Sequence, residues 1–137
     1  MAPRIRVTSL LVDDQEKAHA FYTEKLGFIT KQDLKMEQGW WLTVASPDAP
    51  DEVELSLEPN NNPTLAGAAQ AYQRALFENG IPATAFAVDD IHAEVEQMKA
   101  RGVQFTLDPT PMGPVIVAML DDTCGNLIQL FQVTAQQ

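Results

Sequence analysis

Apolar and polar positions follow the same order twice along the chain. An apolar run that ends in two aspartates, Ser9 to Asp14, precedes an amphipathic stretch that closes at Gly27. The run Ala85 to Asp90 precedes a similar stretch that closes at Gly102. Aspartate is suited to cap the start of a helix and glycine to end one. Because both copies keep this order, we interpret the chain as an internal duplication in which each copy begins with a strand and a helix.

Three strand-like segments follow each of these helices. They are rich in branched and aromatic residues and are separated by turn formers, as strands usually are. The segments are Phe28 to Leu34, Gly39 to Ala45 and Glu52 to Glu58 in the first copy, and Val103 to Leu107, Pro114 to Asp121 and Asn126 to Val133 in the second. Each copy therefore predicts the order β-α-β-β-β.

An alanine-rich stretch with good helix propensity joins the two copies. With 137 residues, of which 45% are hydrophobic, the chain has the length and composition of one folded domain. We therefore expect a single α+β domain over residues 1–137. It comprises a first repeat at about 4–59, a linker helix at about 63–79 and a second repeat at about 81–134.

Net charge narrows the range of partners. The formal charge is −10, and the chain beyond residue 36 holds fourteen acidic side chains against three basic ones. Nucleic acids and anionic lipids are bound largely through Lys and Arg, so we expect neither as a partner. The longest apolar run, Val115 to Leu120, is far shorter than the ~20 residues that span a bilayer. The one cysteine, Cys124, fits a reducing compartment, and we expect a cytoplasmic protein.

The element order and two local motifs resemble the vicinal oxygen chelate superfamily. That superfamily includes glyoxalase I, extradiol dioxygenases, fosfomycin-modifying enzymes and bleomycin-sequestering proteins. The motifs are Phe21 to Phe28 at the end of the first helix and the hairpin Asp122 to Leu130. The resemblance implies that the strands of each repeat curve into half of a ligand-holding cup. It also implies that two chains pair as a homodimer.

The resemblance further implies a divalent metal held by strand residues, but this chain lacks most of the ligands. The two usual histidine positions fall at Val7 and Ala83, and the glutamate position of the final strand falls at Gln129. Only the fourth position, at or next to Glu54, keeps a carboxylate, and both histidines of the chain lie in predicted helices. We therefore predict no metal ligand set and no cofactor. The alternative is a divalent metal (Mg, Mn, Ni or Zn) with atypical oxygen ligands.

Candidate ligand contacts share strand faces with these positions. The adjacent Trp40 and Trp41 point to opposite faces of their strand, one toward the core and the other toward the cup or a dimer interface. Glu54 and Ser56 lie on the polar face of an alternating strand, which faces either water or the cup. We assign a catalytic role to no residue. Glu54 is the one candidate for such a role. The full set of pocket candidates is Val7, Ser9, Trp40, Trp41, Glu54, Ser56, Ala83, Ala85 and Gln129.

Three functions are compatible with these residues. The first is a glyoxalase/bleomycin-resistance-like protein that binds a small cationic or aromatic molecule without a metal. The second is a divalent-metal-dependent lyase, isomerase or dioxygenase with atypical ligands. The third is a structural or regulatory dimer whose cup has no role. The missing histidine ligands favour the first function.

Overall fold

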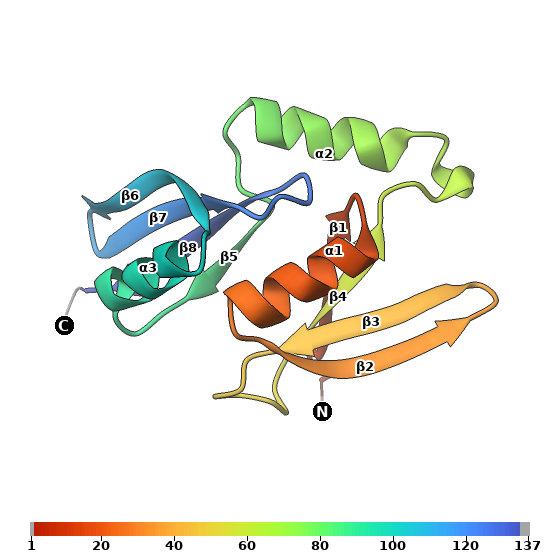
Figure 1. Ribbon diagram of the computed structural model, residues 1–137, viewed down its shortest axis with the longest axis horizontal. Coiled ribbons are helices and arrows are strands. Elements are labelled where there is room, and N and C mark those ends of the chain that lie inside the picture. The colour runs from red at the N-terminus through yellow and green to blue at the C-terminus, as the bar shows by residue number, and fades with distance from the viewer. Residues whose placement is uncertain (1, 135–137) are drawn as a thin grey trace. The chain divides into compact units, whose positions relative to one another are not determined.

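The computed structural model describes residues 2–134 and divides the chain into two compact units, Met1–Ala69 and Gln70–Gln137. Each unit contains a four-stranded sheet with a helix packed on one face (Figure 1). This is the α+β architecture that the duplicated pattern predicts. The grouping of both units into one domain stays a prediction. Within residues 2–134, no helix is long and apolar enough to cross a membrane.

The first unit follows the predicted order of strands and helix. Its strands pair in the order β1-β4-β3-β2, with β1 parallel to β4 and the other neighbours antiparallel. Asp14 caps the helix by accepting a hydrogen bond from the backbone N–H of Lys17. The elements are β1 (Val7–Val12), α1 (Gln15–Ala20), β2 (Ile29–Met36), β3 (Gly39–Ala45) and β4 (Glu54–Pro59).

Two features of the first unit differ from the sequence prediction. The helix does not stay α-helical up to Gly27, because a π-helical segment, Phe21–Lys25, follows α1. Strand β2 runs two residues past the predicted end at Leu34 and contains a β-bulge between Thr30 and Gln32. A bulge adds a residue to one strand and so changes which side chains share a face beyond it.

The predicted linker helix is interrupted. A short 3₁₀ turn, Pro63–Leu65, is followed by α2 (Ala68–Glu78). Ala66 and Gly67, which lie between them, both adopt positive φ angles of 50° and 84°. This left-handed conformation cannot continue a right-handed helix. The prediction of one continuous helix over about 63–79 was therefore wrong.

The second unit repeats the topology of the first. Its strands pair in the order β5-β8-β7-β6, and β5 is parallel to β8. This shared topology agrees with the predicted duplication. Asp90 caps α3 through the backbone N–H of Ala93. The elements are β5 (Thr84–Ala87), α3 (Ile91–Ala100), β6 (Gln104–Met112), β7 (Val115–Asp121) and β8 (Leu127–Val133).

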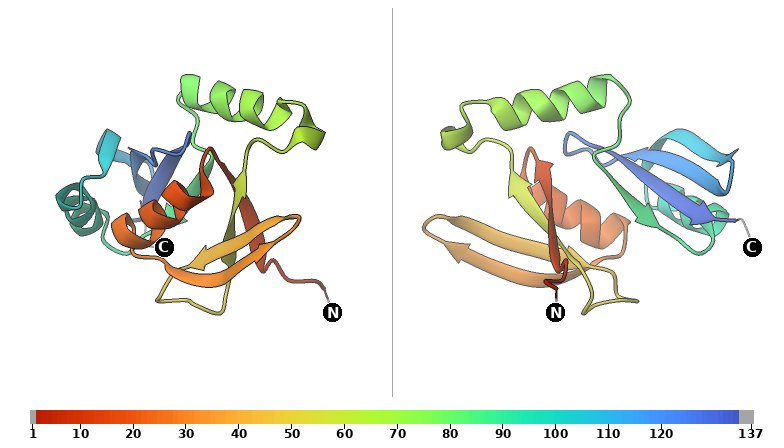
Figure 2. Two further views of the ribbon diagram at one scale, coloured as in Figure 1. Left: turned by 45° about the vertical axis from the view of Figure 1, so that its right-hand side comes forward. Right: turned by 180° about the vertical axis from the view of Figure 1, so that it is seen from behind.

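In each unit a helix lies against one face of the sheet (Figure 2), and side chains of that face are buried. In the first unit the core includes Val12, Tyr22, Leu42 and Leu57, all fully buried. In the second unit α3 contributes Ile91, Val95 and Met98, which are buried together with apolar strand residues such as Leu120 and Ile128. We call the opposite face of each sheet its open face.

A buried polar cluster fixes the hairpin between β7 and β8. The Asp122 carboxylate is fully buried and accepts hydrogen bonds from the backbone N–H groups of Cys124 and Asn126 and from the Asn126 side chain. From α2, the amide of Gln73 donates to the Cys124 carbonyl at 3.2 Å and to Asn126 Oδ1 at 3.1 Å. A Cβ on Gly125 would lie 2.8 Å from Gln73 Nε2, so any larger residue there would displace the Gln73 amide.

Candidate functional site

The open face of the first sheet carries three polar residues of β4 in alternate positions. Glu54, Ser56 and Glu58 lie opposite Val7, Ser9 and Leu11 of β1 in the parallel register. On the other side of β4, Thr43 of β3 lies opposite Ser56. The predicted alternation of this strand is therefore correct. Its polar residues share one face with Val7 and Ser9, a placement that the sequence had left open.

Hydroxyl groups orient the two carboxylates of this face. The Thr43 hydroxyl donates to Glu54 Oε1 at 2.7 Å, and the Ser9 hydroxyl donates to Glu58 Oε2 at 2.8 Å. The backbone N–H of Gln32, at the bulge of β2, donates to Thr43 Oγ1 at 3.0 Å. Because this N–H uses the hydroxyl oxygen as acceptor, the Thr43 proton is directed toward Glu54.

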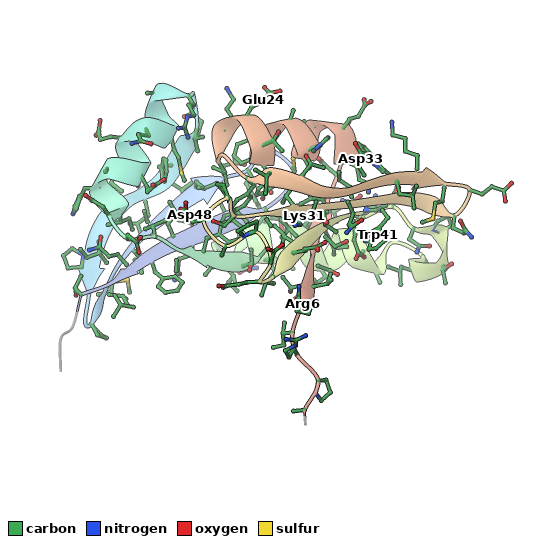
Figure 3. All side chains as sticks on the ribbon, turned by 90° about the horizontal axis from the view of Figure 1, so that it is seen from below. Arg6, Glu24, Lys31, Asp33, Trp41 and Asp48 are labelled. Carbon is green, nitrogen blue, oxygen red and sulfur yellow. The ribbon has the colours of Figure 1, made fainter. Side chains whose placement is uncertain are left out.

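Exposed apolar side chains lie beside these carboxylates. Trp41 is 43% exposed and pairs in register with Leu34 of β2, which is 50% exposed. Val7, 50% exposed, flanks Glu54 on β1. Figure 3 shows Trp41 on the side of the β2–β3 hairpin away from α1, and Asp33 on the side of α1. The open face thus combines an accessible indole, aliphatic neighbours and carboxylates.

Trp40 lies on the opposite face of β3, next to α1. Its ring packs edge-on against His19 at 5.8 Å, and its Nε1 donates to Asp33 at 2.7 Å. Lys35 Nζ lies 4.6 Å from the ring centre. The two tryptophans therefore point to opposite faces, as predicted. Trp40 does not share a face with the other first-unit candidates for ligand contact.

The open face of the second sheet is less polar. Gln129 lies opposite Ala85 of β5 and Met119 of β7, and it is half-buried. Ala83 immediately precedes β5, where its backbone N–H donates to the Leu127 carbonyl. The small alanines leave the Gln129 amide without a charged neighbour in the register of this sheet.

The residues at the expected metal-ligand positions do not fit a divalent ion. In the first unit, Glu54 has the aliphatic Val7 as its partner, and in the second unit the neutral Gln129 has Ala85. Zinc and related ions need several imidazole, thiolate or carboxylate ligands. No group of three His, Cys, Asp or Glu residues within 2–134 is placed to hold a metal. We therefore derive no chemistry through a metal.

The sequence prediction did not include Thr43 in this face, and it placed Glu58 on the polar face of its strand without naming it as a ligand contact. Both follow from alternation, since Thr43 is two residues after Trp41 and Glu58 is two residues after Ser56. The bulge at Gln32 left no sequence signal, because it depends on how β2 pairs with β3.

Two repeated β-α-β-β-β units, each closed by a parallel pair of first and last strands, define an α+β protein of the duplicated type. The model of the Glyoxalase/Bleomycin resistance protein/Dioxygenase superfamily matches residues 4–130. The chain belongs to this superfamily, as the sequence resemblance predicted.

Two relatives of similar length match almost the whole chain. The uncharacterized protein YurT of Bacillus subtilis is 53% identical over 129 residues, which cover 94% of this chain and 98% of YurT. YetH of the same organism is 31% identical over 131 residues, with 95% and 98% of the two chains covered.

Two solved structures extend the comparison to the fold. UcmS2 superposes with a TM-score of 0.82 at 32% identity and covers 96% of this chain and 98% of its own. TnmS3, described as an antibiotic binding protein from Streptomyces sp. CB03234, has a TM-score of 0.75 at 29% identity and covers 96% and 97%. Antibiotic-binding proteins are therefore among the structural neighbours of this chain.

Proposed function

We propose that this chain binds a small, flat aromatic molecule on the open face of its first sheet and does not transform it. The observation that carries the proposal is the exposed indole of Trp41 beside the aliphatic Leu34. Exposed apolar side chains that gather in one place mark interaction sites, and indole rings stack well on flat apolar groups. The description of TnmS3 as an antibiotic binding protein supports a small-molecule antibiotic as the class of ligand.

The donor set on the open faces supports binding without a metal. Glu54 is the single carboxylate at the expected ligand positions, and one carboxylate does not hold a divalent ion against water. The metal-dependent enzyme stays the alternative, and metal content distinguishes the two. In protein purified without chelators, we expect less than one tenth of an equivalent of Mg, Mn, Ni or Zn. Stoichiometric metal that is lost in Glu54→Ala would refute metal-free binding.

The two tryptophans provide an internal test of the binding face. The chain contains only these two, so Trp40→Phe leaves Trp41 as the sole indole fluorophore, and Trp41→Phe leaves Trp40. In a screen of flat aromatic compounds, we expect hits to quench the Trp40→Phe protein and not the Trp41→Phe protein. Equal quenching of both would place the ligand away from the open face of the first sheet.

Stabilisation by hits provides a second readout. A ligand at 100 times its dissociation constant adds about 2.7 kcal/mol to the free energy of unfolding, which raises the melting temperature by several degrees. Dialysis against EDTA should leave this shift unchanged.

We also propose that the protein is a homodimer and acts in the cytoplasm. Light scattering of the purified protein tests the first statement, and cell fractionation tests the second.

A further inference from the structure

We infer that Gln15 is a positioning residue for the ligand site, because it fixes the peptide group that precedes Trp41. This inference rests on the proposed function, in which the Trp41 indole is the ring that stacks on the ligand. Gln15 lies on the α1 side of the first sheet and does not touch the ligand. It acts through the main chain and makes the indole a preformed platform for a flat aromatic ring.

Gln15 bridges two strands with one amide group. It is the first residue of α1, directly after the Asp14 cap, and it is half-buried. Its Nε2 donates to the Trp40 carbonyl of β3 at 2.9 Å and to the Leu57 carbonyl of β4 at 2.9 Å. A primary amide has two N–H donors, so these two carbonyls use both of them.

The two carbonyls need this donor because the ladder between β3 and β4 is short. Within the described part of the chain, these strands pair at only two positions, Thr43↔Ser56 and Val44↔Leu55. If that register continued, Trp40 would lie opposite Pro59, which has no N–H to donate. Leu57 is fully buried, and a buried carbonyl without a donor is unfavourable. Gln15 therefore supplies from the helix a donor that the ladder lacks.

The Trp40 carbonyl belongs to the peptide group that joins Trp40 to Trp41. A peptide group is planar, so a hydrogen bond to its carbonyl restrains the backbone angles at Trp41. These angles decide which side-chain rotamers are allowed. The indole of Trp41 is 43% exposed, and among the described residues it has no hydrogen bond and no aromatic contact. Its direction therefore depends strongly on its main chain, which Gln15 anchors.

The bridge can be tested first in the unchanged protein. Gln97 on α3 is exposed and serves as the reference for a glutamine side chain in water. In NMR spectra, we expect the Gln15 side-chain amide protons to exchange with water about tenfold more slowly than those of Gln97, because both are hydrogen-bonded. Equal exchange would overturn the inference without any substitution.

Gln15→Glu removes the donors and keeps the shape of the side chain. A carboxylate only accepts hydrogen bonds, and an acidic residue in the first turn of a helix is favourable, so α1 should still form. In a Trp40→Phe background, Trp41 is the one indole fluorophore and the carbonyl of residue 40 is retained. We expect the fast component of its time-resolved fluorescence anisotropy to grow about twofold, because the indole gains rotamer freedom on the nanosecond timescale. Gln15→Leu, which adds no charge, should give the same increase.

A more mobile indole should bind its ligand more weakly. If Trp41 changes from one rotamer to three that are equally populated, the binding-competent fraction falls to one third and the affinity falls about threefold. Calorimetric titration of 2-naphthalenemethanol measures this loss in Gln15→Glu and Gln15→Leu. In a Trp41→Ala background, Gln15→Glu should cause no further loss. A further threefold loss there would overturn the role of Gln15 as a residue that acts through Trp41.

Thr30→Val is the matched control for the packing of α1 on the sheet. The Thr30 hydroxyl is hydrogen-bonded to His19 Nε2 of α1 at 2.8 Å, so this variant also removes a hydrogen bond between the helix and the sheet. It leaves the Trp40 carbonyl and Gln15 in place. We expect unchanged anisotropy and unchanged affinity. Equal effects of Thr30→Val and Gln15→Glu would mean that helix packing in general, and not the bridge, orders Trp41.

The outcomes separate this role from the proposed function. Unchanged anisotropy in Gln15→Glu and Gln15→Leu would overturn the inference and leave the proposed function standing. Faster motion of Trp41 without weaker binding of 2-naphthalenemethanol would overturn the role of Gln15 in the ligand site. If this compound does not bind, a hit from the aromatic screen replaces it. If no aromatic compound binds, the proposed function fails, and the anisotropy still decides whether Gln15 orders the indole.

Discussion

Gly125 is the position where a single methyl group should have the largest effect on the second unit. Its φ angle is +98°, and a Cβ there would lie 2.8 to 3.2 Å from the amide atoms of Gln73. Gln73 is 6% exposed, and its side-chain amide donates to the Cys124 carbonyl and to Asn126 Oδ1. Gly125→Ala therefore combines backbone strain with displacement of a buried side chain.

The expected magnitude follows from these two parts. A non-glycine residue in left-handed backbone costs roughly 1–2 kcal/mol. The Gln73 amide is the end of a flexible side chain and can rotate away from the new Cβ, but it then loses two hydrogen bonds of about 1 kcal/mol each. We expect Gly125→Ala to lower the free energy of unfolding by about 3 kcal/mol.

Urea denaturation followed by circular dichroism measures this loss, and two further variants separate its parts. Gly113→Ala is the backbone control, because Gly113 also has a positive φ of +65° and no atom lies within 4 Å of its Cβ position. It should lose about 1 kcal/mol. In a Gln73→Ala background the clash is absent, so Gly125→Ala should there cost only the backbone part. The double-mutant cycle should give a coupling of about 2 kcal/mol.

Two results would refute this reasoning. Equal losses in Gly125→Ala and Gly113→Ala would mean that the contact with Gln73 has no energetic role. Strict additivity of Gln73→Ala and Gly125→Ala would mean the same. Either result would imply that α2 is not held to the β7–β8 hairpin in solution.

Three smaller predictions concern the second unit. The Cys124 thiol is fully buried and should react with a water-soluble disulfide reagent at least 100-fold more slowly in the native protein than in urea; a fast native reaction would contradict this burial. Asp122→Asn sets an amide donor against the Asn126 amide and should lower the free energy of unfolding by about 2 kcal/mol in urea titrations. The hydrogen bond and attraction to Asp108 raise the pKa of Lys99 above its ordinary value. The stabilisation from this pair is therefore present below the ordinary lysine pKa and is lost as the pH rises through the raised pKa of Lys99. NMR of the Lys99 Cε should show a lower pKa in Asp108→Asn than in the unchanged protein. An unchanged pKa would count against the pair.

The sequence predicted the parts of the fold that depend on local signals. The Asp14 and Asp90 caps lie where the aspartate pairs indicated, and the polar alternation of Glu54 and Ser56 is correct. The end of β6 was not predictable in this way. The predicted strand ends at Leu107, whereas β6 continues through Pro109 and Pro111 to Met112. Because β6 is the edge strand of its sheet, it can include residues that lack a backbone donor.

The candidate site was only partly predictable, because some of its contacts depend on strand pairing and not on local sequence. Trp41, Glu54 and Ser56 could be identified from their own strands. The hydrogen bonds from Thr43 to Glu54 and from Ser9 to Glu58 depend on the register of three strands. Register is set by pairing between segments far apart in the chain, and one sequence does not specify it. The bulge that places the Gln32 N–H against Thr43 is a further case.

The parallel pairing of β1 with β4 has a consequence for synthesis of the chain. Val7 cannot meet Glu54 until the last strand of the first unit has left the ribosome, so this sheet closes late relative to its own hairpins. The residues from Pro63 to the start of β5 are translated next, after β1 can pair with β4 and before the strands of the second unit are made. We expect the first unit to complete its sheet while β5 to β8 are still being made, because compact units generally fold in the order of their synthesis. The duplicated architecture thus divides folding into two successive closures of similar size, each of which involves only its own strands.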